Sequence, residues 1–576
     1  MNRHRSGRAC VQAEGLGHPA ARILARERPT HSTRSTRPNA CASPLVGVLA
    51  AVALLAGCGS LPTLEGRPVS TAIPADAGTR LHEAIGPLVD ANPGLTGIHS
   101  LGDGREAFAA RVALAEVAER SLDVQYYIWH GDVSGRLMFE ALRRAADRGV
   151  RVRLLLDDNN TKGLDPTLAA LDAHPNVEVR LFNPFPNRSN RILGYATDFG
   201  RLNRRMHNKS FTADGVATIV GGRNVGDEYF AAGEGIGFLD LDVIAIGAVV
   251  PEVAKSFDAY WSSQSAYPVD RIVPAAAPGD LEALAARGRE TLESAAGAAY
   301  FESVRQTEFV RRVLKGELEW DWSRAHLVVD DPAKGLNRAQ RKDYLTSSLE
   351  HVVGPAQREV HVVSPYFVPM KEGVEAFAAL EARGVQVVVL TNALEATDVA
   401  AVHAGYAKRR RALLVAGVEL YELKRSAVPT PVGGAVEQRM FSGSGSGGGG
   451  ARADGAPGGS AAGSSGGASL HAKTFAVDRD RVFVGSFNFD PRSAALNTEM
   501  GLVLHSPALA SRLADAFEDG IPRASYEVRL APDGRSLLWV ERAADGETVH
   551  TTEPGTTGFQ RFAVGTMALL PIDWLL

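Results

Sequence analysis

A motif of about twenty residues occurs twice in the chain, and this internal duplication constrains the fold more than any other feature. The copies are RMHNKSFTADGVATIVGGRN at 205–224 and SLHAKTFAVDRDRVFVGSFN at 469–488. The matching positions are His207, Lys209, Asp214, Gly221 and Asn224 in the first copy, and His471, Lys473, Asp478, Gly485 and Asn488 in the second. We therefore expect two similar halves, each carrying one copy.

Each copy predicts a β-hairpin. Side chains alternate along a strand, so His207 and Lys209 would point to the same side. Asp214-Gly215 suits a two-residue turn, and residues 216–220 read as the returning strand. In that register Gly222 would lie across from His207 and leave room beside the imidazole. A plain solvated hairpin would explain one copy alone, but not the repeat.

The segments before the motifs repeat as well. RRAADRGVRVRLLLDD at 143–158 resembles AALEARGVQVVVLTN at 378–392. Each reads as the end of an amphipathic helix, a turn at Arg-Gly and a buried apolar strand. Helices that alternate with strands predict an α/β fold with mixed, largely parallel sheets.

The pattern divides the chain into segments. With 45% apolar and 22% charged residues, the composition is that of a globular protein. We expect a first half over 96–269, a helical connector over 270–345, a second half over 346–505 and a C-terminal extension over 506–576. Gly, Ser and Ala dominate residues 442–469, which predicts a disordered insertion, either an inert spacer or a lid.

The N-terminal region predicts a signal peptide over 1–57. Its apolar run at 44–57 is too short to span a bilayer comfortably but suits a signal-peptide core. LAGC at 55–58 resembles the lipobox of bacterial lipoproteins, which implies lipidation at Cys58; a short anchor is the alternative. Residues 58–95 are rich in Pro, Gly and Ala, which predicts a tether. Gly59 implies the outer membrane by the same resemblance. We thus expect a lipid-anchored protein of the cell envelope that faces the periplasm.

Charge argues against a nucleic-acid partner. Residues 1–57 hold eight arginines and two glutamates, so their removal changes the net charge from −4 to −10. A chain with this charge lacks the positive field on which nucleic-acid binding usually depends.

The paired motifs, each followed by Gly-x-x-Asn, resemble the twin HKD motifs of the phospholipase D superfamily over residues 96–505. More narrowly, HNKSFTADGVATIVGGRNVGDEYF, GSFNFDPRSAALNTEMG and LLVAGVELYEL resemble bacterial cardiolipin synthases, in particular their C-type branch. The resemblance implies two halves packed about a pseudo-two-fold axis, with both motifs in one cleft. It implies phospholipid substrates, no cofactor and no metal; lysines beside both imidazoles would also repel a divalent ion.

Two histidines suit phosphodiester chemistry. Displacement at phosphorus is in line, so one imidazole cannot serve both the nucleophile and the leaving group. One histidine would form a phosphohistidine while the other protonates the leaving alkoxide and later deprotonates the acceptor. By resemblance, His207 is the nucleophile and His471 the acid/base. The non-bridging oxygens would be held by Lys209, Lys473, Asn224 and Asn488, with Gly222 and Ser486 beside them.

A carboxylate should fix the tautomer of each imidazole. By resemblance, Glu499 has this role for His471. The corresponding position of the first half is Gly235, so we assign Asp240 there, with Asp242 as its rival. Asp214 and Asp478 belong to the catalytic motifs, but we expect them to brace the hairpins.

Together these features predict a phosphatidyltransferase that makes cardiolipin through a phosphohistidine, with phosphatidylglycerol as the acceptor. If water is the acceptor, the same machinery is a phospholipase D. A phosphodiesterase or nuclease of the same superfamily is the nearest alternative, and a non-catalytic lipid-binding envelope lipoprotein is an alternative of another class. The sequence gives no information about a partner protein.

Overall fold

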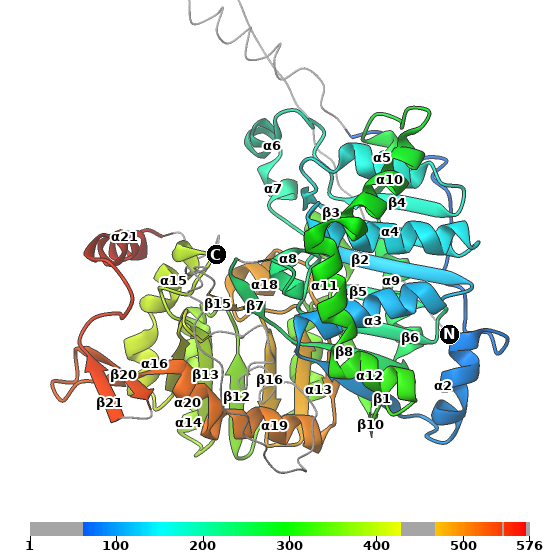
Figure 1. The fold of residues 1–576 in the computed structure, drawn as a ribbon. Coiled ribbons are helices and arrows are strands. Elements are labelled where there is room, and N and C mark those ends of the chain that lie inside the picture. Colours follow the sequence, from blue (N-terminus) through cyan, green and yellow to red (C-terminus); the bar gives the residue numbers. More distant parts are fainter. Residues whose placement is uncertain (1–60, 234, 428–466, 544–545, 572–576) are drawn as a thin grey trace, which may run out of the picture. The chain divides into compact units, whose positions relative to one another are not determined.

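The computed structural model describes residues 61–233, 235–427, 467–543 and 546–571, which belong to one compact unit spanning Gly59–Leu576. Two mixed sheets form its centre (Figure 1). The predicted signal peptide, Cys58 and most of the Gly/Ser-rich insertion lie outside the described residues. Among the helices that are described, none is both long and apolar enough to cross a bilayer.

The first sheet has the order β10-β1-β8-β6-β5-β2-β3-β4-β9. Its strands are β1 (Thr96–Leu101), β2 (Ser121–Ile128), β3 (Arg151–Asn160), β4 (Val177–Phe182), β5 (Ser210–Ala213), β6 (Ala217–Gly221), β8 (Asp242–Gly247), β9 (Ala266–Pro268) and β10 (Asp321–Ser323).

Helices cover both faces of this sheet because its strands are apolar on both sides. On β3, Leu154 and Leu156 pack into the cluster that includes α3 (Gly104–Val117), α4 (Val133–Asp147) and α5 (Asp165–Asp172). Leu155 points the other way and packs against α9 (Val250–Trp261). This arrangement explains why the strand reads as a continuous apolar run.

The second sheet has the order β11-β18-β17-β16-β12-β13-β14-β19-β20-β21. Its strands are β11 (Ala325–Val329), β12 (Glu359–Val363), β13 (Gln386–Asn392), β14 (Glu419–Leu423), β16 (Thr474–Val477), β17 (Arg481–Gly485), β18 (Met500–Leu504), β19 (Ser525–Leu530), β20 (Leu537–Ala543) and β21 (Gly546–His550). Helices α13 (Leu345–Val353), α14 (Met370–Glu381), α15 (Ala400–Ala407), α16 (Arg410–Val415) and α19 (Pro507–Glu518) pack around it.

The two sheets confirm the duplication. The run β1-β8-β6-β5-β2-β3-β4-β9 corresponds strand by strand to β11-β18-β17-β16-β12-β13-β14-β19. Both sheets are mixed, as expected. Their parallel pairings are confined to β2-β3-β4 and β12-β13-β14, so the parallel share is smaller than the sequence predicts.

The halves share a hydrophobic core. Val220 and Val243 of the first half lie in one buried cluster with Val484 and Leu502 of the second. Contacts between β6 or β8 and β17 join the sheets at this point. The short strands β7 (Gly237–Leu239) and β15 (Ala468–Leu470) also pair in parallel across the halves. Since Ala468 and Ser469 belong to β15, the insertion ends earlier than expected.

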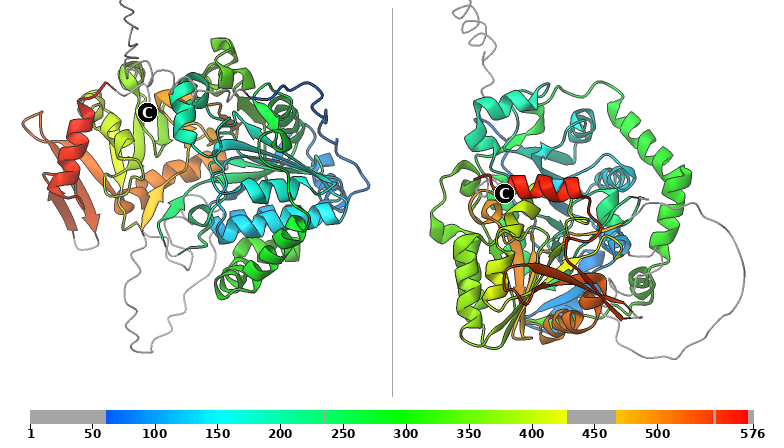
Figure 2. Two further views of the ribbon diagram at one scale, coloured as in Figure 1. Left: turned by 90° about the horizontal axis from the view of Figure 1, so that it is seen from above. Right: turned by 90° about the vertical axis from the view of Figure 1, so that its left-hand side faces the viewer.

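The connector and the C-terminal extension are more integrated than expected. Helices α10 (Asp280–Glu293), α11 (Ala295–Arg305) and α12 (Glu308–Lys315) pack against α3, α4 and α5 (Figures 1 and 2). The rest of the connector supplies an edge strand to each sheet, β10 and β11. The extension contributes β19, β20 and β21 to the second sheet before ending in α21 (Gly558–Ala568).

The expected tether is held against the first half from residue 61 onward. Arg67 donates to the carbonyls of Ser263 and Ala266 at 2.6 and 2.7 Å. The buried Arg180 donates to the Pro68 carbonyl at 2.6 Å. A buried guanidinium needs acceptors, and the backbone of this segment supplies them. Helix α2 (Arg80–Asp90) then leads into β1.

Candidate active site

The motif hairpins place both histidines just before a strand. β5 begins at Ser210, so His207 and Lys209 precede it. Asp214 and Gly215 both have positive φ, 52° and 66°, and Val216 N–H donates to the Ala213 carbonyl at 2.9 Å. The turn dipeptide is therefore as predicted, although the strand itself is shorter.

Gly222 leaves no open space beside the imidazole. A Cβ at Gly222 would lie 2.1 Å from Oδ1 of Asp240. The prediction of open space at Gly222 is wrong, because the Asp240 carboxylate fills that space. Gly222 thus allows an acid to approach the backbone closely.

Each histidine is held by the backbone of the opposite half. The N–H of His207 donates to the Thr498 carbonyl at 2.8 Å, and that of His471 donates to the Leu239 carbonyl at 2.7 Å. The residues that follow these two carbonyls are Glu499 and Asp240. Thr498-Glu499 therefore lies next to the histidine of the first half, and Leu239-Asp240 lies next to that of the second.

The carboxylates also cross between the halves. Nδ1 of His207 lies 2.8 Å from Glu499, and Nδ1 of His471 lies 2.5 Å from Asp240. The expected assignment of Glu499 to His471 and Asp240 to the first half is therefore wrong. Both carboxylates sit beside their own hairpin, whereas the imidazole that each one meets comes from across the interface.

Backbone register explains why Asp240 rather than Asp242 occupies this position. Gly222 N–H donates to the Leu241 carbonyl at 3.2 Å, and Ser486 N–H donates to the Met500 carbonyl at 2.8 Å. Asp240 is therefore the structural equivalent of Glu499. Asp242, two residues later, is the first residue of β8, and Arg111 binds its carboxylate at 2.8 Å.

Burial sets the electrostatics of the site. The side chains of His207, Lys209, His471 and Lys473 are all buried. Burial lowers the pKa of the His207 imidazole well below its usual value, and Lys209 and Lys473 add to this effect. Burial and Lys473 also lower the pKa of His471, while Asp240 opposes that shift.

The two carboxylates have different acidities. Burial raises the pKa of Glu499 to about 7, although Lys209 and the Ser486 hydroxyl oppose the shift. For Asp240 burial acts in the same direction, but His471 and Lys473 outweigh it and lower the pKa to about 2. Near neutral pH, His471 therefore faces an ionised carboxylate, whereas His207 faces one that is partly protonated.

The lysines and asparagines surround the imidazoles. Lys209 Nζ donates to the His207 carbonyl at 2.5 Å, and Lys473 Nζ lies 3.0 Å from His471 Nδ1. Burial lowers the pKa of Lys473 to about 8. Asn224 Oδ1 accepts the Ile128 N–H at 3.1 Å, while its buried Nδ2 has no hydrogen-bond partner among the described residues. The Asn224 side chain also interacts with the hydroxyl of Tyr229, which packs against His471.

Aromatic rings that the motifs do not predict pack against both imidazoles. Tyr127 stands edge-on to His207 with ring centroids 5.0 Å apart, and Tyr229 stands edge-on to His471 at 5.1 Å. Phe238 lies 5.0 Å from His471. The spacing of the two motif copies gave no signal for any of these three rings.

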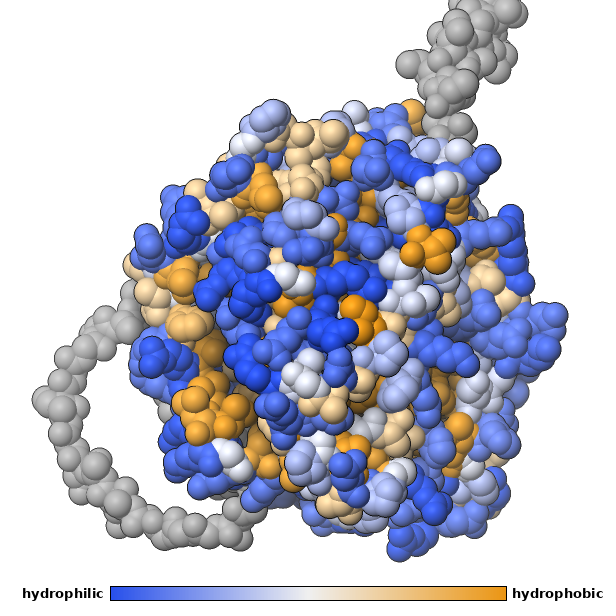
Figure 3. Space-filling model, turned by 90° about the vertical axis from the view of Figure 1, so that its right-hand side faces the viewer, coloured by the Kyte–Doolittle hydropathy of each residue, from blue (hydrophilic) through white to orange (hydrophobic). Residues whose placement is uncertain are grey.

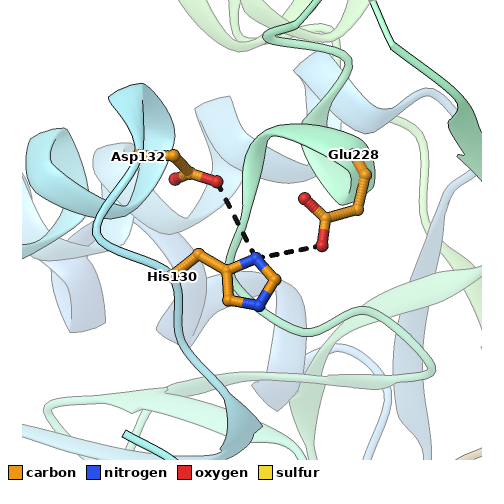
Figure 4. A group of neighbouring side chains, drawn as sticks. All are labelled: His130, Asp132 and Glu228. Carbon is orange, nitrogen blue, oxygen red and sulfur yellow. Dashed lines mark ion pairs between the residues drawn. The ribbon is translucent and has the colours of Figure 1, made fainter. Parts of the chain in front are cut away.

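A second titratable cluster lies beside the site. His130 Nδ1 faces Glu228 at 3.1 Å and Asp132 at 3.9 Å (Figure 4). The hydrogen bond to Glu228 raises the pKa of His130. These three ligand atoms lie within 4.8 Å of one another, which is close enough to hold a cation. However, Asp132 already accepts the N–H of Asp227 at 2.8 Å and so has a structural use.

The motif aspartates lie far from the imidazoles along the hairpins. Seven residues of extended chain separate Asp214 from His207, about 20 Å at the rise of a strand. Asp214 accepts the backbone N–H groups of Glu119, Arg120 and Ser121 at 2.8–3.2 Å. Asp478 accepts those of Gln357, Arg358 and Glu359 at 2.7–3.2 Å. Both carboxylates join a hairpin turn to the start of the neighbouring strand.

Comparison with known proteins agrees with this geometry. The family model "Cardiolipin synthase, PLD-like domain" matches residues 112–261, 349–439 and 457–520. Cardiolipin synthase C of Escherichia coli (strain K12) is 46% identical, over 86% of this chain and 100% of that protein. A cardiolipin synthase of Staphylococcus aureus (strain Mu50 / ATCC 700699) is 23% identical, over 76% and 70%. The crystal structure of phosphatidylserine synthase from Haemophilus influenzae Rd KW20 shares the fold, with a TM-score of 0.51, 12% identity and coverage of 86% and 100%.

We predict that Asp214→Ala affects stability rather than chemistry. Three backbone N–H groups would lose a charged acceptor, at a cost of about 3 kcal/mol. The melting temperature should fall by several degrees, while the rate per folded molecule stays close to that of the unchanged protein. Asp533→Ala is the matched control, because Asp533 binds two backbone N–H groups in an exposed turn. A stable but inactive Asp214→Ala variant would contradict the bracing role.

Proposed function

Because the chain belongs to the PLD-like cardiolipin synthase family, we propose that it transfers a phosphatidyl group to phosphatidylglycerol and so makes cardiolipin. The observation that carries the proposal is the pair of buried imidazoles, each fixed through Nδ1 by a carboxylate from the opposite half. With both Nδ1 atoms occupied, the two Nε2 atoms are left to act on one phosphodiester.

The reaction has two displacement steps. In the first, Nε2 of His207 attacks phosphorus, the bond from phosphorus to the headgroup oxygen breaks, and His471 gives its Nε2 proton to that oxygen. In the second, the glycerol hydroxyl of the acceptor gives its proton to His471 and attacks phosphorus. The phosphorus–nitrogen bond then breaks, and His207 is free again.

The environments of the two imidazoles support this assignment of roles. A nucleophile must be neutral, and the lowered pKa of His207 beside a partly protonated Glu499 keeps it so. A general acid must carry a proton. Burial and Lys473 lower the pKa of His471 as well, but the ionised Asp240 at 2.5 Å opposes that shift, so His471 is the easier of the two imidazoles to protonate. Carboxylates whose acidities differ in this way are typical of paired acid and base groups.

Lys209, Lys473, Asn224 and Asn488 would bind the non-bridging oxygens of the phosphodiester. Negative charge builds on these oxygens in the displacement, and buried cations stabilise it strongly. The bound phosphate would in turn favour the charged form of Lys473, since an opposite charge raises the pKa of an amine.

Both substrates are bilayer lipids, so the enzyme must work at a membrane. We include lipidation at Cys58, with the protein in the cell envelope and facing the periplasm, in the proposal. An anchor of this kind keeps the active site close to its substrates and raises their effective concentration.

The direct test is to follow lipid products by mass spectrometry in vesicles of phosphatidylglycerol and phosphatidylethanolamine. We expect cardiolipin from the unchanged protein and none from His207→Ala, because the nucleophile is absent. Labelled phospholipids would identify the donor. Phosphatidic acid as the only product would mean that water is the acceptor, and unchanged lipids would refute the proposal.

The roles of the two histidines can be separated with a phosphatidyl ester of p-nitrophenol. This leaving group departs without a proton, so His471→Asn should release about one equivalent of p-nitrophenol in a burst and then stall. His207→Asn should release none. A burst in His207→Asn and not in His471→Asn would reverse the assignment.

The pH profile should reflect Lys473. Its ammonium form, needed to hold the phosphate, is lost as the pH rises through about 8. We therefore expect kcat/KM to fall above about pH 8. The corresponding fall in kcat should occur at higher pH, because bound phosphate favours the protonated form of Lys473. In Lys473→Arg the cation persists, so the fall in kcat/KM should move to higher pH even if the rate is lower. If the fall stays at the same pH, another group causes it.

A further inference from the structure

We propose that a lipid bilayer binds to one apolar face of the described unit, made by α6 (Arg191–Thr197), α7 (Phe199–Leu202) and α21. We name this the docking face. One helix from each half, α6 and α21, contacts residues at the end of a strand that leads toward the active site, so we expect lipids bound here to reach the two imidazoles. The inference rests on the proposed function, because substrates with two acyl chains must reach the site from a bilayer.

Helix α21 is apolar on two opposite sides. Val564 is buried and packs with Leu394 and Ala404 of the second half. Phe559 and Phe562, three residues apart on the other side, are 78% and 71% exposed. A surface helix usually turns polar residues toward water, so this exposed side is suited to a second apolar environment.

The first half contributes the exposed side chains of α6 and α7. Ile192 is 83% exposed, and Leu193 and Phe199 are 38% and 44% exposed. Of sixteen exposed large hydrophobic side chains on the described residues, seven come from these three helices and the two residues after α21. Isolated exposed apolar residues are ordinary, whereas a concentration of this kind marks a binding surface.

Contacts connect both parts of the docking face to the active site. On α6, Tyr195 donates to Asn159 at 2.6 Å, at the end of β3; the next residue, Asn160, pairs with Ile128 beside Tyr127. In the second half, Val564 of α21 packs with Leu394, two residues after Asn392 at the end of β13. Asn392 exchanges hydrogen bonds of 2.8 and 3.0 Å with Leu470, directly before His471.

The views of the fold agree with these contacts. In Figure 1, α6 and α7 lie above β7 and β15, and α21 lies to the left of these two strands. β7 and β15 lead into the acid and the histidine of the site. On the right-hand face of the same unit, hydrophobic residues are scattered among hydrophilic ones (Figure 3).

Chemistry favours lipid over a protein as the occupant. A protein that covered α6, α7 and α21 together would also cover the site between them and exclude its substrates. Lys408 donates to the Leu570 carbonyl at 3.0 Å, which places an ammonium beside the apolar end of α21. A lysine at the rim of an apolar surface can extend to lipid headgroups while its stem stays in the interface. Apolar burial would supply the main attraction, since the chain is acidic overall.

Hydrogen exchange of the full chain tests docking without using activity. With vesicles of phosphatidylglycerol and phosphatidylethanolamine, we expect slower exchange in α6, α7 and α21 and no change in α12. Helix α12 is the internal control because Leu314 on it is 81% exposed yet lies outside the docking face. Exchange that vesicles leave unchanged in α6, α7 and α21 would overturn the proposal. Slow exchange that depends only on protein concentration would also overturn it, because a second copy would then cover the face.

Rates of paired variants give the second test. Phe559→Gln/Phe562→Gln should lower the rate on vesicles roughly tenfold, but should not change the rate on short-chain phosphatidylglycerol dissolved as single molecules. Leu314→Gln, the matched control, should change neither rate. Equal losses on both substrates would refute a docking role. If the unchanged protein acts on neither substrate, the proposed function fails, and hydrogen exchange alone decides whether the bilayer binds here.

Discussion

The active site depends on contacts by which each half binds the catalytic histidine of the other. Thr498-Glu499 binds the backbone and the imidazole of His207, and Leu239-Asp240 does the same for His471. Neither half contains a complete histidine–carboxylate pair of its own. The shared apolar core of Val220, Val484 and Leu502 is therefore a requirement of the chemistry, because it keeps the two hairpins at bonding distance from the opposite acids. Well-packed interiors deform little, which suits a site assembled across an interface.

Duplication supplies two equivalent imidazoles, whereas a displacement at phosphorus requires two different ones. The two halves differ in the residue that lies next to each carboxylate. Ser486 donates a 2.5 Å hydrogen bond to Glu499, whereas its counterpart Gly222 has no side chain and lets Asp240 approach the backbone closely. The acid on one side has a pKa of about 7 and the acid on the other about 2. A pseudo-symmetric scaffold can thus give its two imidazoles different proton affinities.

Sequence patterns predicted the parts of the site but not how the parts are paired. The repeat spacing identified His207, Lys209, His471 and Lys473, since both copies had to share one register. It could not show that each acid serves the opposite histidine, because spacing within one half contains no information about the other. Asp240 and Asp242 were indistinguishable for the same reason; only the bond from Gly222 to Leu241 fixes the register.

The larger fold shows a similar limit. Long apolar strands such as β3 and β13 were predictable, because their burial is written in a continuous run of residues. The edge strands β10 and β11 were not, since three to five residues at a sheet edge carry little pattern of their own. Residues 61–79 looked like a tether for their Pro and Gly content. Arg67 of this segment instead donates to the Ala266 carbonyl, 199 residues away in the sequence. Arg153 and Arg180 of the first half donate to the Ser70 and Pro68 carbonyls of the segment.

Transfer and hydrolysis differ only in the hydroxyl that attacks the second time, and the motif residues treat both alike. Water is the more abundant acceptor wherever it has access, so a transferase must exclude it while the phosphohistidine exists. Burial of the imidazoles serves this need within the protein, and the edge-on rings of Tyr127 and Tyr229 narrow the approach to them. If a bilayer bound at the docking face covers the entrance to the site, the hydroxyl that arrives is that of a lipid. The choice of acceptor then depends on the surroundings of the site rather than on its catalytic residues.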